Sequence, residues 1–128
     1  MDLWVAGDAQ NNLTVPLNLV ERRSAGQWVI QNTVNAGVGE NHFYGIASEG
    51  GVSYAVGGYA PSVNGALNTI IERHDSSGWT QEVTPSPGKQ FGNSLVGGIA
   101  IVGPSDVWAV GAYDGPNAAH SLVLHRCR

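Results

Sequence analysis

The sequence has 128 residues and a mass of 13.4 kDa, a length that suits one domain or part of a larger repeating one. Hydrophobic residues make up 42% of it and charged residues 12%, which excludes the low hydrophobicity and high charge of a disordered chain. The formal net charge is −4 and Lys89 is the only lysine, so the composition argues against nucleic acid as a partner.

Ten short segments, taken in chain order, have the composition of β-strands. Each is rich in Val, Ile, Trp or Tyr or in small residues, and clusters of Gly, Pro, Asn, Asp or Ser separate them. No stretch has the apolar spacing of an amphipathic helix, so the sequence predicts an all-β fold. The segments are Asp2–Gly7, Leu19–Arg23, a strand beginning at Trp28, Tyr44–Ala47, Val52–Gly57, Ile70–His74, a strand beginning at Trp79, Gly97–Ala100, Asp106–Gly111 and Val123–Cys127.

Four kinds of segment recur in the same order about every 50 residues. Trp4, Tyr54 and Trp108 occupy one kind at spacings of 50 and 54 residues, and Trp28 and Trp79 occupy another, 51 residues apart. The small-residue segments at 44–47 and 97–100 are 53 residues apart, and 19–23, 70–74 and 123–127 align as the fourth kind. Four antiparallel strands repeated at this period are typical of the blades of a β-propeller.

The repeats divide the chain into about two and a half blades of one partial propeller domain, residues 1–128. Residues 1–41 supply three strands, residues 42–93 a complete set of four, and residues 94–128 three more. The aromatic residues at the recurring positions are expected to pack one blade against the next. The recurring pairs Glu21-Arg22 and Glu72-Arg73 are expected to form surface ion pairs between blades, because neighbours on a strand point to opposite faces.

The segment Leu95–Gly111 resembles the blade repeat of bacterial, often secreted, β-propeller proteins. In that repeat a GVA…SxDVWAVG stretch precedes an IEHWDGTSW…PSP stretch, and this chain supplies the second half as Ile71–Trp79 followed by Pro85-Ser86-Pro87. The period is also similar to that of kelch repeats, and the first copy departs from the pattern because no Pro-x-Pro follows Trp28. The resemblance implies a propeller fold and an extracellular or cell-surface location in bacteria. It implies little about function.

Two and a half blades are too few to close a ring, since propellers have about four to eight blades. The first and last blades would each leave a strand edge unpaired, and such edges recruit other chains. We therefore expect either self-association, most simply as a dimer, or completion of the ring by further blades of a longer chain. No apolar run reaches the roughly 20 residues of a membrane helix and no signal-peptide pattern is present, so membrane insertion is not expected.

The predicted topology puts the short hairpin turns on one face and every long connection on the other. Binding residues concentrate on loops that a rigid scaffold holds, so the long-loop face is the predicted ligand site. Its amides, carboxylate and rings suit a protein or carbohydrate surface. The candidate ligand-binding residues are Asn12, His42, Tyr59, Asn64, Asn93, Tyr113, Asp114, Asn117 and His120.

The sequence contains no catalytic, phosphate-binding or metal-ligand motif that we recognise, so no cofactor or metal is expected. Cys127 is the only cysteine, which excludes an internal disulfide. The first hypothesis is a non-enzymatic binding or scaffold module that uses the long-loop face. A carbohydrate-binding propeller and a propeller hydrolase with active residues around the central channel are the alternatives.

Overall fold

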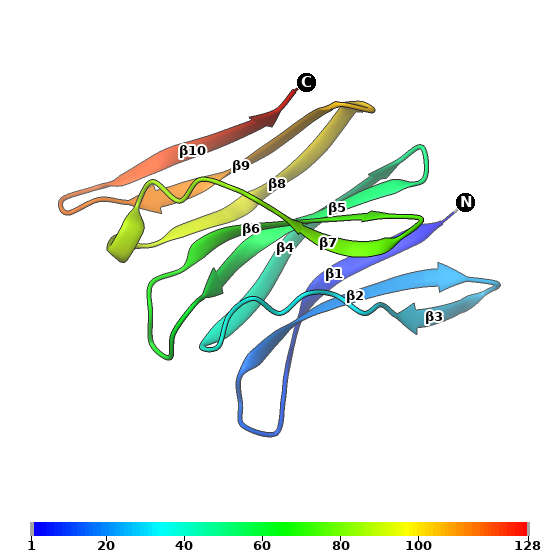
Figure 1. Cartoon of the computed structure of the whole chain (residues 1–128), viewed down its shortest axis with the longest axis horizontal. Helices are drawn as coiled ribbons and strands as arrows, with labels where there is room; N and C mark the ends of the chain where they lie inside the picture. The colour runs from blue at the N-terminus through cyan, green and yellow to red at the C-terminus, as the bar shows by residue number, and fades with distance from the viewer. Residues whose placement is uncertain (1, 128) are drawn as a thin grey trace.

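The structure, a computed structural model, describes residues 2–127 and is all-β (Figure 1). Within these residues there are ten strands and no α-helix, and one short 3₁₀ turn spans Lys89–Phe91. The strands are β1 (Leu3–Gln10), β2 (Pro16–Ser24), β3 (Gln27–Ile30), β4 (Glu40–Glu49), β5 (Val52–Ala60), β6 (Asn68–Asp75), β7 (Gly78–Glu82), β8 (Asn93–Gly103), β9 (Asp106–Asp114) and β10 (Ala119–Arg126).

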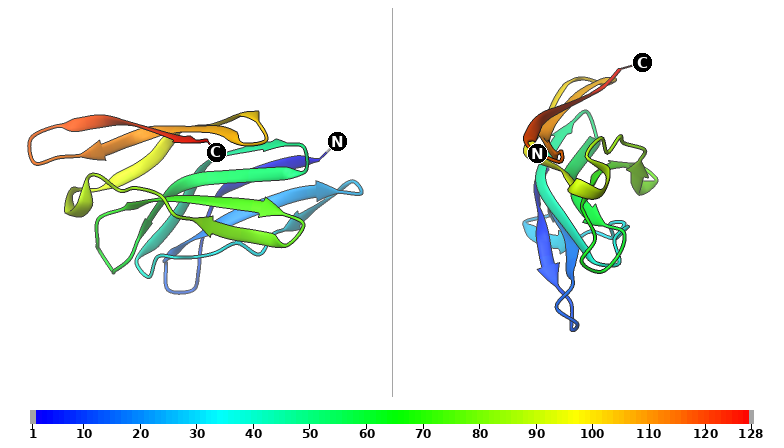
Figure 2. Two further views of the ribbon diagram at one scale, coloured as in Figure 1. Left: turned by 45° about the horizontal axis from the view of Figure 1, so that its top comes forward. Right: turned by 90° about the vertical axis from the view of Figure 1, so that its left-hand side faces the viewer.

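The strands form three antiparallel sheets in chain order. The N-terminal sheet has the order β1-β2-β3, the middle sheet β4-β5-β6-β7, and the C-terminal sheet β8-β9-β10. The middle sheet lies between the other two, as the two views in Figure 2 show. The all-β prediction is confirmed for the described residues, whose ten strands fall into groups of three, four and three.

The strand pairing corrects the alignment of the last repeat by one residue. Gly7, Gly57 and Gly111, three residues after the recurring aromatic residue, pair across the sheet with Leu19, Ile70 and Leu122, respectively. Leu122 is therefore the counterpart of Ile70, and Val123 is one position further along. The sequence could not settle this register because Leu122, Val123 and Leu124 are all apolar, and a one-residue slip reverses which side chains face the core.

Short and long connections lie at opposite ends of the sheets (Figure 1). The β4–β5 hairpin turns at Gly50 and Gly51, whose φ angles of 59° and 81° match the type I′ turn that suits twisted antiparallel strands. The β2–β3, β6–β7 and β8–β9 connections are equally short and lie at this short-turn end. The long-loop end carries the connections 11–15, 31–39, 61–67, 83–92 and 115–118.

Two apolar cores hold the three sheets together. Val20 of β2 packs with Phe43, Ala55 and Ile70 of the middle sheet, and each of these four side chains is at most 2% exposed. On the opposite face of the middle sheet, Val56 packs with Leu95, Ala109 and Leu122 of the C-terminal sheet. Burying one such aliphatic or aromatic side chain contributes about 1.5–3 kcal/mol, so these cores are the main source of stability.

Candidate functional site

The long-loop end presents several of the predicted ligand-binding residues to solvent. Asn12, Asn64 and Asn117 are exposed in three different connections, and Asp114 and His120 are exposed at the base of the β9–β10 connection. His42 is partly buried, as are Tyr59 and Tyr113, which pack against the first and second core, respectively. The exposed polar groups therefore come from sheets that the cores hold in fixed positions.

Asn93 requires a correction, because its side chain is buried and its polar atoms are used internally. It is 3% exposed, its Oδ1 accepts a hydrogen bond from the Gly88 N–H at 2.5 Å, and its Nδ2 donates to the Leu67 carbonyl at 3.0 Å. It braces the β7–β8 connection and is not available to a ligand. A Cβ at Gly88 would lie 2.2 Å from the Gly92 carbonyl oxygen, so this brace requires a glycine.

Asn41 makes the same brace one repeat earlier. Its Oδ1 accepts from the Gly37 N–H at 2.7 Å, while its Nδ2 donates to the carbonyls of Gly37 at 2.8 Å and Pro16 at 3.3 Å. Asn41 and Asn93 thus each tie a long connection to the preceding sheet. The spacing of 52 residues between the two asparagines is the sequence signal that marks them as structural.

His42 links the N-terminal sheet to the middle sheet near the long-loop end. Its Nδ1 lies 3.2 Å from Asp8 Oδ1 on β1, and its Nε2 lies 3.0 Å from Glu40 Oε2 on β4. Burial opposes protonation of the ring, but the hydrogen bonds to Glu40 and Asp8 outweigh it and raise the pKa of His42. The ring also stacks on Tyr44, with centroids 5.7 Å apart.

Sequence reasoning missed Asp8, Glu40 and Tyr44 as neighbours of His42. Glu40, His42 and Tyr44 alternate along one strand and so share a face, which the spacing of two residues could have indicated. Burial, together with the nearby charges of Asp8 and Glu40, raises the pKa of the Tyr44 hydroxyl. Asp8 comes from another sheet, and no local signal in the sequence brings it to His42.

Tyr113 and His120 form a second aromatic pair at the long-loop end. Their rings stack with centroids 4.9 Å apart, across the pair of strands β9 and β10. Asp114, the last residue of β9, and Asn117 in the turn that joins these strands are exposed. The structure therefore brings together four of the predicted residues, a ring platform beside a carboxylate and an amide.

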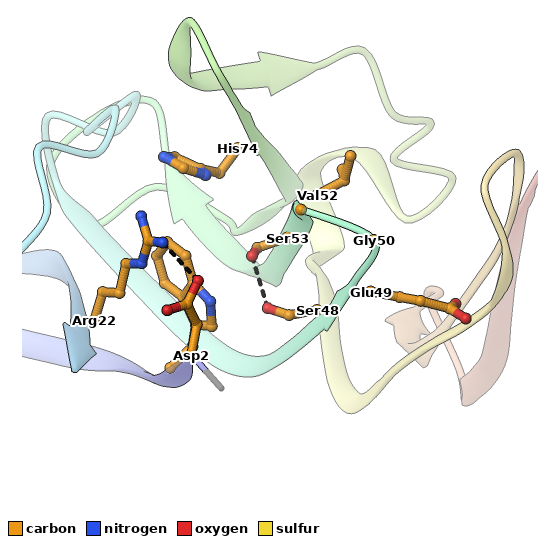
Figure 3. Close-up of a pocket in the computed structure, with 10 residues that line it drawn as sticks. Asp2, Arg22, Ser48, Glu49, Gly50, Val52, Ser53 and His74 are labelled. Carbon is orange, nitrogen blue, oxygen red and sulfur yellow. Dashed lines mark hydrogen bonds and ion pairs between the residues drawn. The ribbon is translucent and has the colours of Figure 1, made fainter. Parts of the chain in front are cut away.

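The short-turn end carries a pocket that the sequence did not predict. It has a volume of about 240 Å³, lies between the N-terminal and middle sheets, and is lined by Asp2, Trp4, Arg22, His74 and residues 48–53 (Figure 3). The Arg22 guanidinium donates to Asp2 Oδ2 at 2.5 Å and lies over the Trp4 ring, 5.1 Å from its centroid. The rim is therefore polar and only partly paired, because Arg22 Nε and His74 Nδ1 are buried and have no hydrogen-bond partner among the described residues.

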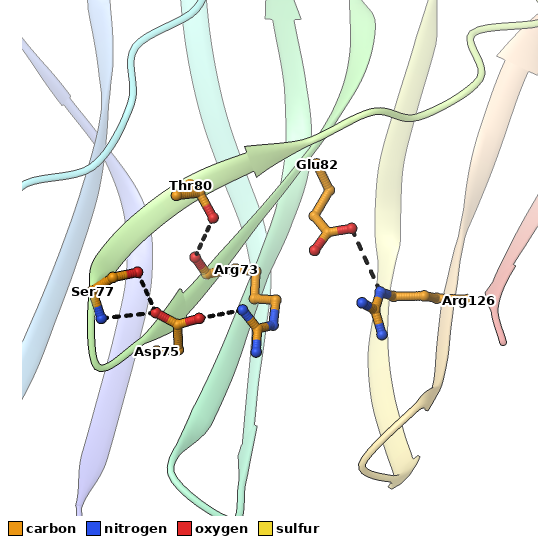
Figure 4. Close-up of polar contacts among 6 residues, drawn as sticks. All are labelled: Arg73, Asp75, Ser77, Thr80, Glu82 and Arg126. Atoms are coloured by element: carbon orange, nitrogen blue, oxygen red, sulfur yellow. Dashed lines mark hydrogen bonds and ion pairs between the residues drawn. The ribbon is translucent and has the colours of Figure 1, made fainter. Parts of the chain in front are cut away.

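The recurring Glu-Arg pairs do not form ion pairs between sheets, contrary to the sequence prediction. Arg22 pairs with Asp2, while Arg73 pairs with Asp75, which also accepts hydrogen bonds from the backbone and hydroxyl of Ser77 (Figure 4). The bonds from Ser77, followed by the contact with Arg73, lower the pKa of Asp75 to about 2. An ion pair between Glu82 and Arg126, at 3.5 Å, joins the middle sheet to the C-terminal sheet (Figure 4).

Glu72 is fully buried, although its alternation with apolar residues indicated a surface position. Its Oε2 accepts a hydrogen bond from the Val34 N–H at 3.0 Å, and its Oε1 accepts a longer one from Asn18 Nδ2 at 3.4 Å. Burial raises the pKa of Glu72 to about 7, although these two bonds oppose the shift. Strand periodicity alone cannot distinguish this site from a surface glutamate, because both faces of a middle sheet are covered.

The recurring aromatic residues divide into two groups. Trp4 and Trp79 pack between the first two sheets with their rings 5.7 Å apart, and Tyr54 is 2% exposed between the second and third. Trp28 and Trp108 are 47% and 40% exposed, so for these two residues packing between sheets stays a prediction. They lie on the outer sheets, where the described residues provide no further sheet to cover them.

Trp108 instead stacks on His125 of the adjacent strand. The ring centroids are 3.9 Å apart, and His125 Nε2 lies 2.8 Å from Asp106 Oδ1.

Cys127 is a free thiol and is exposed. Among residues 2–127 no group of three or more His, Cys, Asp or Glu side chains is arranged to hold a metal ion. The described part of the chain also has no helix long and apolar enough to span a membrane.

Comparison with known proteins finds no protein family whose model matches the sequence, no similar curated protein, and no solved structure that resembles the fold.

Proposed function

We propose that this chain is a segment of a β-propeller and serves as a binding or scaffold module whose long-loop end contacts a protein partner. The observation that carries the proposal is that the two cores are built from equivalent positions. Phe43, Ala55 and Ile70 in the first core correspond to Leu95, Ala109 and Leu122 in the second. The middle and C-terminal sheets therefore use equivalent faces to pack on the sheet that precedes each of them. Successive blades of a propeller pack in the same repeated way.

The long-loop end suits a binding role because its connections are both polar and braced. The buried side chains of Asn41 and Asn93 hold two of the connections to the sheets. Exposed amides at Asn12 and Asn117 and the carboxylate of Asp114 lie in or beside two other, shorter connections of the same end. A rigid base reduces the ordering cost of binding, which favours recognition by these loops.

A second candidate function is carbohydrate binding, which the stacked pair Tyr113 and His120 favours. An aromatic platform accepts the apolar face of a sugar, and the neighbouring Asp114 and Asn117 supply an acceptor and a mixed donor and acceptor for hydroxyl groups. This candidate uses the same end of the molecule, so one experiment compares the two.

The test is to probe arrays of glycans and of immobilised proteins with the chain and with two matched double variants. Asn12→Ala with Asn117→Ala removes exposed amides at the long-loop end, and Ser24→Ala with Ser76→Ala changes exposed residues at the short-turn end. The proposal expects at least tenfold weaker binding for the first variant only. Equal loss in both variants, or turnover of substrates from a hydrolase panel, would contradict it, and binding restricted to glycans would favour the second candidate.

A further inference from the structure

Two apolar sheet faces are exposed at the two extremes of the structure. On the C-terminal sheet Trp108 and Val110 are each 40% exposed and Val123 is 56% exposed. On the N-terminal sheet Leu3 and Val5 are 44% and 51% exposed. Large uncovered apolar patches on soluble proteins mark interaction surfaces, so we expect another apolar surface to cover each of these faces.

The strand register shows what covers the same positions inside the chain. Trp108 pairs with His125 as Tyr54 pairs with Arg73, so Trp108 corresponds to Tyr54. In the same register Val110 corresponds to Val56, and Val123 corresponds to Ile71 of the middle sheet. Tyr54 and Val56 are 2% and 0% exposed because the C-terminal sheet covers them. The exposed face of the C-terminal sheet is therefore the kind that receives a following sheet.

The exposed face of the N-terminal sheet is the complementary kind. Leu3 corresponds to Val107 and Val5 to Ala109, because these positions share one register in their strand pairs. Val107 and Ala109 are 3% and 1% exposed on the side of the C-terminal sheet that faces the middle sheet. Each kind of face is thus already packed against the other within the chain, at two successive sheet-to-sheet contacts.

We propose that a second copy of this chain docks head to tail, with the Trp108 face of one copy packed on the Leu3 face of the other. The two faces of one copy cannot meet, because the middle sheet separates them. A second copy supplies both complementary faces at once. Two copies contain six sheets, and propellers close with roughly four to eight blades, each of them one sheet. Head-to-tail contacts form a closed ring when the rotation that relates the copies allows it.

This inference rests on the repeat arrangement behind the proposed function but not on ligand binding at the long-loop end. The two can therefore fail separately. Loss of association would leave loop binding measurable in a monomer, and a lack of any ligand would leave the mass of the particle unchanged. The measurement is light scattering at 10 to 100 µM with three variants of the chain, whose folding is confirmed by circular dichroism.

The variants test the direction of the contact. Val110→Asp places a charge on one face, Val5→Asp places one on the other, and Leu13→Asp alters an exposed apolar residue in the β1–β2 connection as a control. The wild type and the control are expected at twice 13.4 kDa, and each face variant alone at 13.4 kDa. An equimolar mixture of the two face variants keeps one intact contact and is expected to recover the dimer mass.

Three results would overturn the inference. A wild-type chain that is monomeric at 100 µM, or that aggregates without a defined mass, would assign the exposed faces to other sheets, such as further blades of a longer polypeptide. A dimer that survives both Val110→Asp and Val5→Asp would place the contact elsewhere. A dimer lost in only one of these variants, with no recovery on mixing, would show that like faces meet.

Discussion

The carboxylate of Glu72 on β6 accepts a hydrogen bond from the backbone N–H of Val34, 3.0 Å away in the connection that follows the N-terminal sheet. This contact ties the connection to the middle sheet through a fully buried acidic group, which also accepts a hydrogen bond from Asn18 on β2 of the N-terminal sheet. A buried carboxylate loses its hydration, so its ionised form costs folding free energy. The hydrogen bonds from Val34 and Asn18 offset part of that cost. The packing of the first two sheets is therefore coupled to the protonation of one residue.

We predict that stability falls as the pH rises from about 4.5 to about 7. Burial raises the pKa of Glu72 from 4.5 to about 7, so between these values the folded chain holds a proton that the unfolded chain has released. The contribution is fully present below the unfolded pKa and is lost as the pH rises through the folded pKa. Its size is on the order of a few kcal/mol, to be measured by urea unfolding at several pH values.

Glu72→Gln is expected to flatten this part of the pH profile, because glutamine keeps an acceptor for the Val34 N–H and does not ionise. Glu21→Gln, the counterpart on β2 with a partly exposed side chain, serves as the control and should keep the wild-type slope. A slope that persists in the Glu72 variant would assign the effect to other groups.

Truncation of the recurring aromatic residues should have unequal effects, although the sequence places them at one repeat position. Tyr54→Ala is expected to cost about 3–5 kcal/mol, because Tyr54 is 2% exposed between two sheets. Trp108→Ala is expected to cost about 1 kcal/mol in the monomeric chain, since Trp108 is 40% exposed and contacts His125. Denaturant unfolding at low micromolar concentration measures both, and equal costs would be inconsistent with the exposed position of Trp108.

The contact of His42 with Asp8 should stabilise the fold most at acidic pH. Because the pKa of His42 is raised above 6.5, its contribution is fully present below pH 6.5 and is lost as the pH rises through the folded pKa. Asp8→Asn removes the charged partner on β1 and is expected to cost about 0.5–1 kcal/mol at pH 5.5 and close to nothing at pH 9. NMR titration of the His42 ring provides a direct check, since the variant should titrate at lower pH.

The positions of the strands could be predicted from the sequence because each is a compact run of β-forming residues between turn residues. The ten segments between residues 2 and 127 and the hairpin at Gly50-Gly51 follow from such local signals. The environment of Glu72 could not be predicted in this way. A strand with both faces covered has the same alternation as one at the surface, and the difference depends on neighbouring sheets that lie far away in the sequence.

The candidate site was predictable only at the level of its location. The topology places the long connections at one end, and the exposed Asn12 and Asn117 lie there. The role of each individual residue could not be predicted, because an asparagine in a loop either faces solvent or hydrogen-bonds to buried backbone groups. Asn93 is of the second kind, and only its repeat partner Asn41 distinguishes it from Asn117 in the sequence.

Asn93→Ala is therefore expected to destabilise the fold, whereas Asn117→Ala should change stability by less than about 0.5 kcal/mol. The first substitution leaves the buried Gly88 N–H without its acceptor, and such an unpaired group costs about 1–3 kcal/mol. The Leu67 carbonyl loses the Asn93 side chain but keeps the hydrogen bond from the Asn93 backbone N–H at 2.7 Å. Hydrogen exchange at the Gly88 amide measures the local effect, and thermal unfolding measures the global one. If Asn93 served a ligand instead, both variants would unfold at the wild-type temperature and the Gly88 amide would stay protected. Faster exchange at Gly88 together with a lower unfolding temperature in the Asn93 variant alone is the result that the buried brace requires.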